Sequence, residues 1–323
     1  MRVYFPEPTA DDAMEELSSQ VGPDVQVLTG EIPTDYEVLI AGRPTDEMLT
    51  MPSLRALILP FAGVPQTTLE QLRKNRHISG HNLHHNASDT AEVALALLFA
   101  AAKDVVPLDK RLRHNDWGYD AEYRSLALEG KTALILGLGQ IGQRIGRVLV
   151  ALGLNVLAIN RTGSPSGIEG VETFSTDRLH DLLPRANILM VALPMTSQTT
   201  ALIRAKELAM LPKDAVLVNI ARGPIVEEEA LYNALKRGQL HSAGLDVWYR
   251  YPSGAEPGTP EPEKSTAPSN FPFSDLENVV MSPHRGGTSA DTEVHRIRGL
   301  ASVIKSIAKG EAAPNKIDLD AGY

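Results

Sequence analysis

Short apolar runs bounded by glycine or proline alternate with amphipathic stretches along most of the chain. Continuous apolar runs of this length are typical of strands that are buried on both faces of a parallel sheet. The alternation is most regular between residues 131 and 283, where it predicts strands at 133–136, 156–159, 188–193, 215–220, 242–247 and 279–281. Helices are predicted between them at 141–152, 179–183, 206–210 and 227–237. The pattern favours the α/β class with a doubly wound parallel sheet.

Outside this region the pattern is sparser. Residues 38–41 and 57–59 read as buried strands, and residues 89–102 as a helix that is apolar on most faces. We expect that helix to pack between domains or against a second subunit. A long helix at 290–309 could return to the first domain. The proline-rich stretch 252–274 is long for a loop in a compact domain, and it is either a tolerated surface excursion or a flap over a cleft.

Composition narrows the function classes. The 323 residues are enough for two domains. The formal net charge of −9 argues against nucleic acid or an anionic membrane as the main partner. Without cysteine there is no disulfide, thiolate nucleophile or Cys-ligated metal centre. The N-terminal stretch lacks the apolar core of a secretory signal, and the longest apolar run, 93–102, is too short to span a membrane. We expect a soluble cytoplasmic protein.

The first chemical motif is a glycine-rich loop, Gly137-Leu-Gly139-Gln140-Ile141-Gly142, between a predicted strand and a predicted helix. The three glycines would allow a tight turn, close approach of a pyrophosphate and packing of helix on strand. The helix N-terminus offers unpaired N–H groups to the phosphates. The loop therefore predicts dinucleotide binding.

The second strand of that unit ends in Asn160-Arg161-Thr162, where an NAD enzyme usually has an acidic residue for the ribose hydroxyls. Asn160 removes the charge that would repel a 2′-phosphate, and Arg161 can pair with that phosphate. In the alternative, Arg161 only stacks on the adenine. We favour NADP(H), with NAD(H) as the alternative.

Four further stretches identify a family. They are Val191-Ala-Leu-Pro-Met-Thr-Ser-Gln-Thr199, Leu217-Val-Asn-Ile-Ala-Arg-Gly, Gly244-Leu-Asp-Val-Trp248 and Met281-Ser-Pro-His-Arg-Gly-Gly-Thr288. In this order and spacing the chain closely resembles the D-isomer-specific 2-hydroxyacid dehydrogenases over residues 86–300. The resemblance implies a central Rossmann domain, a Rossmann-like substrate domain made of both chain ends, an active site between them, and a homodimer. The implied domains are 1–100 plus 288–323 for the substrate and 101–287 for NAD(P).

The resemblance also implies roles for single residues. Arg222 matches the arginine that grips the substrate carboxylate and polarises its carbonyl, and a guanidinium suits that role. His284 matches the proton donor and acceptor, for which imidazole has a suitable pKa. Asp246 matches an acidic residue near the nicotinamide carboxamide. The other implied cofactor contacts are Leu193, Pro194, Thr199, Ile220, Ala221 and Gly286.

One position departs from the family pattern. The glutamate that normally holds the histidine and raises its pKa is replaced by Tyr251. A tyrosine offers a hydrogen bond without a charge, and the neighbouring Arg285 should lower the pKa of His284. Formate dehydrogenases also lack this glutamate, because their reaction removes no alcohol proton. A carboxylate from the proline-rich loop could substitute; the candidates are Glu256, Glu261 and Glu263.

In the first domain, the turn Phe61-Ala62-Gly63-Val64 stands where the family binds the substrate carboxylate on backbone N–H groups. Four histidines follow it, at positions 77, 81, 84 and 85. They are ordinary loop residues, contacts for an anionic substrate or, least well supported by their spacing, metal ligands. We predict no metal.

Taken together, the sequence predicts an oxidoreductase that transfers a hydride between NADP(H) or NAD(H) and a small 2-oxo acid or D-2-hydroxy acid, with Arg222, His284 and Tyr251 at the reacting centre. One alternative is a dehydrogenase of an unusual acid that needs no Glu–His relay, as in formate dehydrogenases. Another is a nucleotide-binding interaction protein similar to the transcriptional corepressors that share this fold.

Overall fold

The structure is a computed structural model that describes residues 1–7, 11–118, 125–252 and 266–323. The chain forms two compact units. One comprises Met1–Ala87 with Thr288–Tyr323, and the other comprises Ser88–Gly287. Of the predicted proline-rich loop 252–274, residues 253–265 lie outside the described part, and with them Glu256, Glu261 and Glu263.

The second unit is built on a seven-stranded sheet in which every paired strand is parallel. Its strands are β6 (Thr132–Leu136), β7 (Asn155–Ile159), β8 (Val171–Phe174), β9 (Ile188–Val191), β10 (Val216–Asn219), β11 (Ser242–Leu245) and β12 (Val279–Met281). They lie in the order β12-β11-β10-β9-β6-β7-β8. The order reverses at β6, between β7 and β9, and such a switch point is where doubly wound sheets bind ligands.

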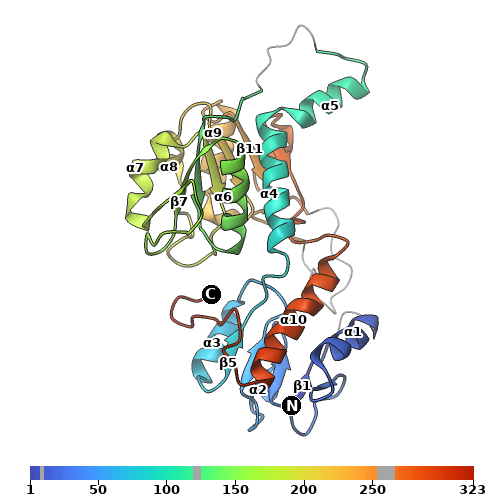
Figure 1. The fold of residues 1–323 in the computed structure, drawn as a ribbon. Coiled ribbons are helices and arrows are strands. Elements are labelled where there is room, and N and C mark those ends of the chain that lie inside the picture. The colour runs from blue at the N-terminus through green and yellow to red at the C-terminus, as the bar shows by residue number, and fades with distance from the viewer. Residues whose placement is uncertain (8–10, 119–124, 253–265) are drawn as a thin grey trace. The chain divides into compact units, whose positions relative to one another are not determined.

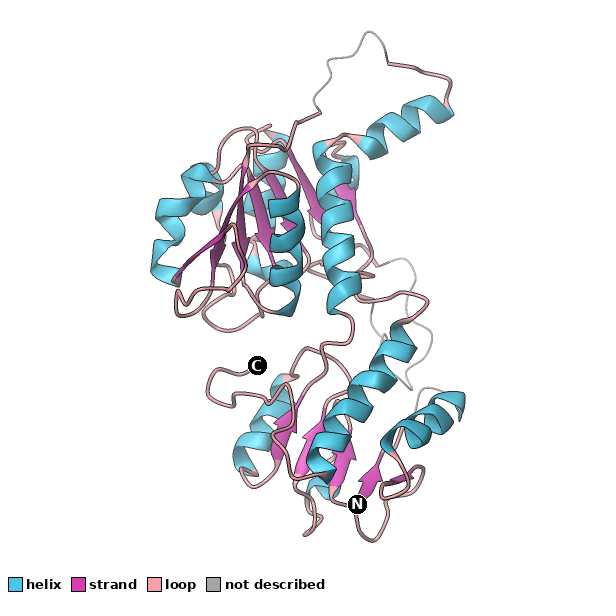
Figure 2. Cartoon of the chain, in the orientation of Figure 1, coloured by secondary structure: helices cyan, strands magenta, loops and turns pink. Residues whose placement is uncertain are grey.

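Helices cover both faces of this sheet (Figures 1 and 2). They are α4 (Ala87–Ala102), α6 (Gln140–Ala151), α7 (Leu179–Leu182), α8 (Ala205–Met210) and α9 (Glu228–Lys236). Helix α5 (Val105–Arg113) follows α4, buries none of its residues and projects away from the sheet (Figure 1). Alternate residues of β6 face opposite cores. Ala133 and Ile135 pack with α4 and α6, whereas Leu134 and Leu136 pack on the side of α7, α8 and α9. The continuous apolar strands thus reflect burial on both sides.

Helix α4 packs on the seven-stranded sheet of the second unit. The sequence had predicted that this helix packs between domains or against a second subunit. Its buried residues include Ala94, Leu97 and Leu98, which share a core with β6 and β9. The approach is close enough that a Cβ atom on Gly244 of β11 would lie 2.8 Å from that of Leu97. The division between the units therefore comes after Ala87, not at residue 100 as the sequence suggested.

The first unit has a five-stranded parallel sheet in the order β2-β1-β3-β4-β5. Its strands are β1 (Arg2–Tyr4), β2 (Gln26–Leu28), β3 (Val38–Ile40), β4 (Ala56–Ile58) and β5 (Ser79–His81). One face is covered by α1 (Asp11–Val21) and α10 (Thr292–Ala308), which lie beside each other, and the other by α2 (Asp46–Leu49) and α3 (Gln66–Lys74) (Figure 1). Because α10 supplies core residues such as Leu300 and Ile304, both chain ends are needed for this unit.

The end of the chain runs along β5. The N–H of Ile317 donates to the carbonyl of Gly80 at 2.9 Å, and Asn82 N–H donates to Asn315 at 3.1 Å. No helix in the described ranges is both long and apolar enough to cross a membrane.

Candidate active site

The loop after β6 has the geometry expected of a dinucleotide loop. Gly137 has φ of 96°, and a Cβ atom there would lie 2.7 Å from the carbonyl oxygen of Ala192. A Cβ atom on Gly142 would lie 2.0 Å from the carbonyl oxygen of Gly137. Gly139, by contrast, has nothing within 4 Å of its Cβ position. Gly137 and Gly142 are therefore required by the packing of the protein itself. Gly139 leaves space beside the backbone at the start of α6.

The residues that open α6 are placed for anion binding. Gln140 and Ile141 occupy the first helical turn after Gly139, so their N–H groups have no intrahelical acceptor. The side chain of Gln140 accepts a hydrogen bond from Arg144 Nη1 at 3.1 Å. That arginine also donates to the backbone carbonyl of Gln140, so it ties down this turn.

Asn160 organises the turn after β7. Its side-chain oxygen accepts hydrogen bonds from the N–H groups of Thr162 at 3.1 Å and Gly163 at 2.6 Å. Its Nδ2 donates to the carbonyl of Ser164 at 2.8 Å. Arg161 and Thr162 are exposed at the tip of this turn. The amide of Asn160 thus has a local structural role that the sequence pattern did not reveal.

The loop after β9 contributes Leu193, Pro194 and Thr199. Leu193 packs partly against the core, and Pro194 is exposed. The hydroxyl of Thr199 donates to the carbonyl of Pro194 at 2.7 Å and accepts from the N–H of Thr196 at 2.7 Å. Thr199 therefore closes this turn.

Arg222 extends into solvent from a firmly held backbone after β10. Buried Asn219 accepts from the N–H of Ala221 and donates to the carbonyl of Arg222 at 3.0 Å. Ile220 N–H donates to Val191, which links the loop to β9. The Arg222 side chain donates from Nη1 to the carbonyl of Ala221 at 2.6 Å. Asn219 was not among the predicted site residues, although a polar residue that ends a buried apolar strand could have marked it.

A second constraint on the backbone of Arg222 comes from the loop after β11. A Cβ atom on Gly223 would lie 2.3 Å from the carbonyl oxygen of Trp248, so only glycine fits there. The indole of Trp248 donates to the carbonyl of Ser282 at 2.8 Å. Trp248, another residue that the sequence did not single out, thereby joins the loops that follow β10, β11 and β12.

Asp246 lies beneath the His284 loop. The carboxylate is buried and accepts three hydrogen bonds, from Ser282 Oγ at 2.5 Å and from the N–H groups of Arg285 and Gly286 at 2.9 and 2.8 Å. His284 itself has φ of 57°, a left-handed conformation that costs a non-glycine residue about 1–3 kcal/mol. The three bonds hold this conformation. The sequence associated Asp246 with the nicotinamide; in the structure both carboxylate oxygens are bonded to the loop.

Tyr251 lies against His284, with the two ring centroids 5.4 Å apart and the planes inclined by 51°. Its hydroxyl oxygen accepts a hydrogen bond from the N–H of Trp248 at 3.0 Å. Partial burial, and then the charge of Arg222, lower the pKa of His284, and the charge of Asp246 opposes them. The direction agrees with the sequence argument, but the responsible cation is Arg222 and not the adjacent Arg285.

In the first unit, hydrogen bonds to the backbone carbonyl groups of Phe61 and Ala62 hold the turn Phe61–Val64 in place. Leu83 N–H donates to the carbonyl of Phe61 at 3.3 Å, and buried Asn82 donates to that of Ala62 at 2.6 Å. The Phe61 ring fills the space where Gly42 lacks a side chain. Across the described ranges, the N–H groups of Ala62, Gly63 and Val64 donate to no protein acceptor. Such a row of unpaired donors suits a carboxylate.

The four histidines do not form one site. His81 is buried, with Nδ1 2.9 Å from the Pro314 carbonyl and Nε2 3.2 Å from Ser79 Oγ. His77 is exposed, and His84 and His85 are half-buried. Where the structure describes the chain, no group of three His, Asp or Glu side chains is placed to hold a metal.

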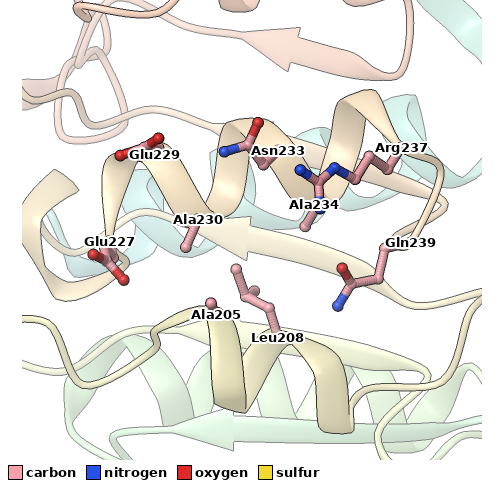
Figure 3. A pocket seen from close by; sticks show the side chains of 9 residues that line it. All are labelled: Ala205, Leu208, Glu227, Glu229, Ala230, Asn233, Ala234, Arg237 and Gln239. Carbon is pink, nitrogen blue, oxygen red and sulfur yellow. The ribbon is translucent and has the colours of Figure 1, made fainter.

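A separate shallow pocket lies between α8 and α9 (Figure 3). Glu227 and Glu229 lie at one end and Arg237 and Gln239 at the other, above Leu208. It contains none of the predicted site residues. Those of the second unit instead follow the carboxyl ends of β6, β7, β9, β10, β11 and β12, which lie at one edge of the parallel sheet.

Comparison with known proteins identifies the family of the chain. Residues 95–286, more than half of the chain, match the model of the D-isomer specific 2-hydroxyacid dehydrogenase, NAD binding domain. The chain belongs to the D-isomer-specific 2-hydroxyacid dehydrogenase family. The family predicted from the motifs and the predicted α/β fold with two parallel sheets are both confirmed.

The relatives of this chain within the family differ in length and in the activity for which they are named. The D-3-phosphoglycerate dehydrogenase of Methanocaldococcus jannaschii is 26% identical over 330 residues, covering 99% of this chain and 60% of that protein. The chain thus spans about three fifths of that relative. The glyoxylate reductase of Aeropyrum pernix is 29% identical, with 98% and 96% covered.

Among solved structures, the NADPH-dependent glyoxylate/hydroxypyruvate reductase of Sinorhizobium meliloti, in complex with NADP and sulfate, has a TM-score of 0.77. It is 22% identical, and the match covers 100% of this chain and 99% of that one. At that identity the similarity concerns the fold. The matched family model describes the NAD-binding domain of a dehydrogenase, in agreement with the motifs, and the named relatives do not favour the formate-type or corepressor alternatives.

Proposed function

We propose that this protein uses NADPH to reduce a small 2-oxo acid to the D-2-hydroxy acid. The main supporting observation is the constellation after β10, β11 and β12. His284 is held in a left-handed turn by buried Asp246, and the charge of Arg222 acts on its imidazole. Both groups follow strands of the sheet that also bears the glycine-rich loop.

In this proposal Arg222 binds the substrate carboxylate and polarises the carbonyl, because a guanidinium presents several donors in one plane. His284 donates the proton to the oxygen that develops negative charge. Independently, the unpaired N–H groups of Ala62, Gly63 and Val64 in the first unit suit a carboxylate, and we propose that they bind one.

The cofactor would be held at the glycine-rich loop, at the start of α6 and at the turns of Asn160 and Thr199. When bound it supplies the hydride. We assign the preference for NADPH to Arg161, which is exposed at the tip of a turn with no acidic side chain at its first position. The space beside Gly139 fits the close approach of a pyrophosphate.

The test is an assay of the purified protein with NADPH or NADH and a panel that includes glyoxylate, hydroxypyruvate and pyruvate. We expect oxidation of NADPH at 340 nm and formation of the D-hydroxy acid by chiral chromatography. The Arg222→Lys variant keeps the charge but loses the planar fork, so it should raise KM for the oxo acid. No turnover with any member of the panel would refute the proposal.

We also propose a homodimer. On α5 the side chains of Val105, Leu108 and Leu112 are 51%, 39% and 50% exposed and share one helix face, and Trp117 beyond it is 66% exposed. Such a face is typical of an association surface. Light scattering coupled to gel filtration should give a dimer for the wild type and a smaller mass for Leu108→Asp/Leu112→Asp. A monomeric wild type would contradict this.

A further inference from the structure

The groups around His284 leave its imidazole without a hydrogen-bonded carboxylate. Four titratable or charged residues lie on the loops about it, namely Arg222, Asp246, Tyr251 and Arg285. Asp246 is the only acid among them, and its oxygens are occupied by Ser282 and by the N–H groups of Arg285 and Gly286. Within the described ranges, the imidazole of His284 has no hydrogen-bond partner.

Tyr251 occupies the position that would otherwise offer a second carboxylate. Its ring covers one side of the imidazole, and its hydroxyl oxygen is bound to Trp248 N–H. Partial burial and the charge of Arg222 together lower the pKa of His284. At neutral pH the imidazole is therefore mainly uncharged, and its ring nitrogen is a better hydrogen-bond acceptor than a proton donor.

The two kinds of substrate differ in what they need from this histidine. Reduction of a ketone leaves an alkoxide that must receive a proton, and a neutral imidazole supplies one poorly. A protonated imine already carries its proton on nitrogen. Its N–H group can donate to a neutral imidazole, whereas a charged imidazolium would repel it.

We propose that this site also reduces 2-imino acids, in their protonated form, to D-2-amino acids. The inference rests on the proposed function and extends its substrate class. C2 receives the hydride of NADPH, the π electrons of the C=N bond move to nitrogen, and the products are a neutral amine and NADP⁺. No proton from the protein is required, and the amine later takes one from water.

The charge balance of the substrate fits the same residues. A 2-iminium carboxylate has no net charge, so its carboxylate can pair with Arg222 while its N–H group faces His284. A 2-oxo acid brings a negative charge only. The carboxylate of Asp246 is committed to the loop by three hydrogen bonds, so the iminium group is left to face His284.

The experiment compares pyruvate alone with pyruvate plus methylamine, at pH 8.5 and with NADPH. Chromatography separates lactate from N-methylalanine, and preformed 1-pyrroline-2-carboxylate serves as an imine that needs no added amine. We expect the wild type to form the amine faster than the alcohol. Tyr251→Glu, which restores a charge beside His284, should lower the amine-to-alcohol ratio by about 10- to 100-fold.

Two further variants separate a chemical role from a structural one. His284→Ala should reduce alcohol formation by about 10²–10⁴-fold, as for a lost general acid, but amine formation by less than about tenfold. Tyr249→Phe is the matched control, since its hydroxyl bonds to Val226 and not to this site, and it should leave the ratio unchanged. Thermal melting and NADPH binding of each variant would reveal any loss of fold.

The outcomes are distinguishable. Alcohol as the only product, with or without amine, would overturn the inference and leave the proposed function standing. No product of either kind would overturn both. Amine formation whose ratio does not respond to Tyr251→Glu would overturn the role assigned to the charge around His284.

Discussion

At the scale of single residues, the proposed chemistry depends on His284, whose protonation is opposed by partial burial and by the charge of Arg222 and favoured by the charge of Asp246. The rigid frame around it is polar and mostly buried. Asp246 holds the loop, Trp248 connects it to the neighbouring strand, and Asn219 fixes the backbone of Arg222. The side chains of Arg222, Tyr251 and His284, for which we propose roles in the reaction, are exposed on this frame. Their positions are thus set by hydrogen bonds among Asn219, Asp246, Trp248 and the backbone of these loops.

The pH dependence of reduction follows from this arrangement. The reaction with a 2-oxo acid needs charged His284, so kcat/KM should fall as pH rises through its pKa. Because burial and Arg222 lower that pKa, the fall should begin below the value of about 6.5 for free imidazole. Tyr251→Glu should move the descending limb to higher pH, and Tyr251→Phe should leave the limb nearly in place. A limb that Tyr251→Glu does not move would mean that another carboxylate already pairs with His284.

We assign the proposed cofactor preference to the turn after β7. Replacing Arg161 with alanine removes the proposed partner of the 2′-phosphate, and Asn160→Asp adds a repelling charge. The double variant should bind NADPH about 10- to 150-fold more weakly, the equivalent of about 1.5–3 kcal/mol, and NADH no worse. Titration of intrinsic fluorescence with each cofactor measures this.

The single variants serve as controls in that titration. Asn160 also donates to the carbonyl of Ser164, so Asn160→Asp alone disturbs the turn, whereas Arg161→Ala does not touch that bond. Arg161→Ala alone should therefore account for most of the loss of NADPH affinity. Unchanged affinity for NADPH in the double variant would refute the assignment.

At the scale of elements, Gly139 before α6 and Gly142 and Gly146 within α6 differ in what surrounds them. We expect Gly142→Ala to destabilise the fold by about 1–3 kcal/mol, since its Cβ atom would meet the backbone of Gly137. Gly139→Ala should leave the free energy of unfolding nearly unchanged and weaken NADPH binding. Gly146→Ala, whose Cβ atom would make ordinary contacts of 3.5 Å, should be neutral or stabilising. Urea unfolding and cofactor titration test all three, and equal losses of stability would contradict this account.

The sequence located most elements of the second unit, because strands buried on both faces must be continuous apolar runs. The strand β12 (Val279–Met281) matches the prediction, and β6, β7 and β10 agree within two residues at each end. Four strands, β1, β2, β5 and β8, were missed, and for β8 and β5 the physical reason is plain. β8 is a half-exposed edge strand, and β5 has the polar sequence Ser-Gly-His, which becomes a strand only through pairing with β4 and with the end of the chain.

The site was predictable in part. A glycine-rich loop can be recognised from the spacing of neighbouring residues. The hydrogen bonds of Asp246 to Ser282, Arg285 and Gly286 span 36 to 40 positions and leave no local sequence pattern. The same holds for Arg222, which is 62 positions from His284 and yet replaces Arg285 as the cation that acts on it. Contacts between separate strand ends appear only when the sheet is assembled.

At the scale of the whole molecule, the two units have separate cores. Two hydrophobic clusters lie entirely within residues 88–287, and two others within the remaining segments. The second unit is also continuous in sequence, whereas the first takes Leu300, Ile304 and Ile317 from the far end of the chain. The units should therefore differ in their ability to fold alone.

We predict that residues 88–287, expressed alone, fold cooperatively and bind NADPH, whereas residues 1–87 alone do not fold. The larger fragment keeps both of its hydrophobic clusters and the carboxyl ends of all strands in the seven-stranded sheet. The smaller fragment loses α10, which supplies part of its core. Circular dichroism should show a sigmoidal melt for the larger fragment. NADPH at about 100 times its dissociation constant should stabilise that fragment by about 2.7 kcal/mol. A fragment that melts without a transition, or whose melt ignores NADPH, would show that the nucleotide unit needs the rest of the chain.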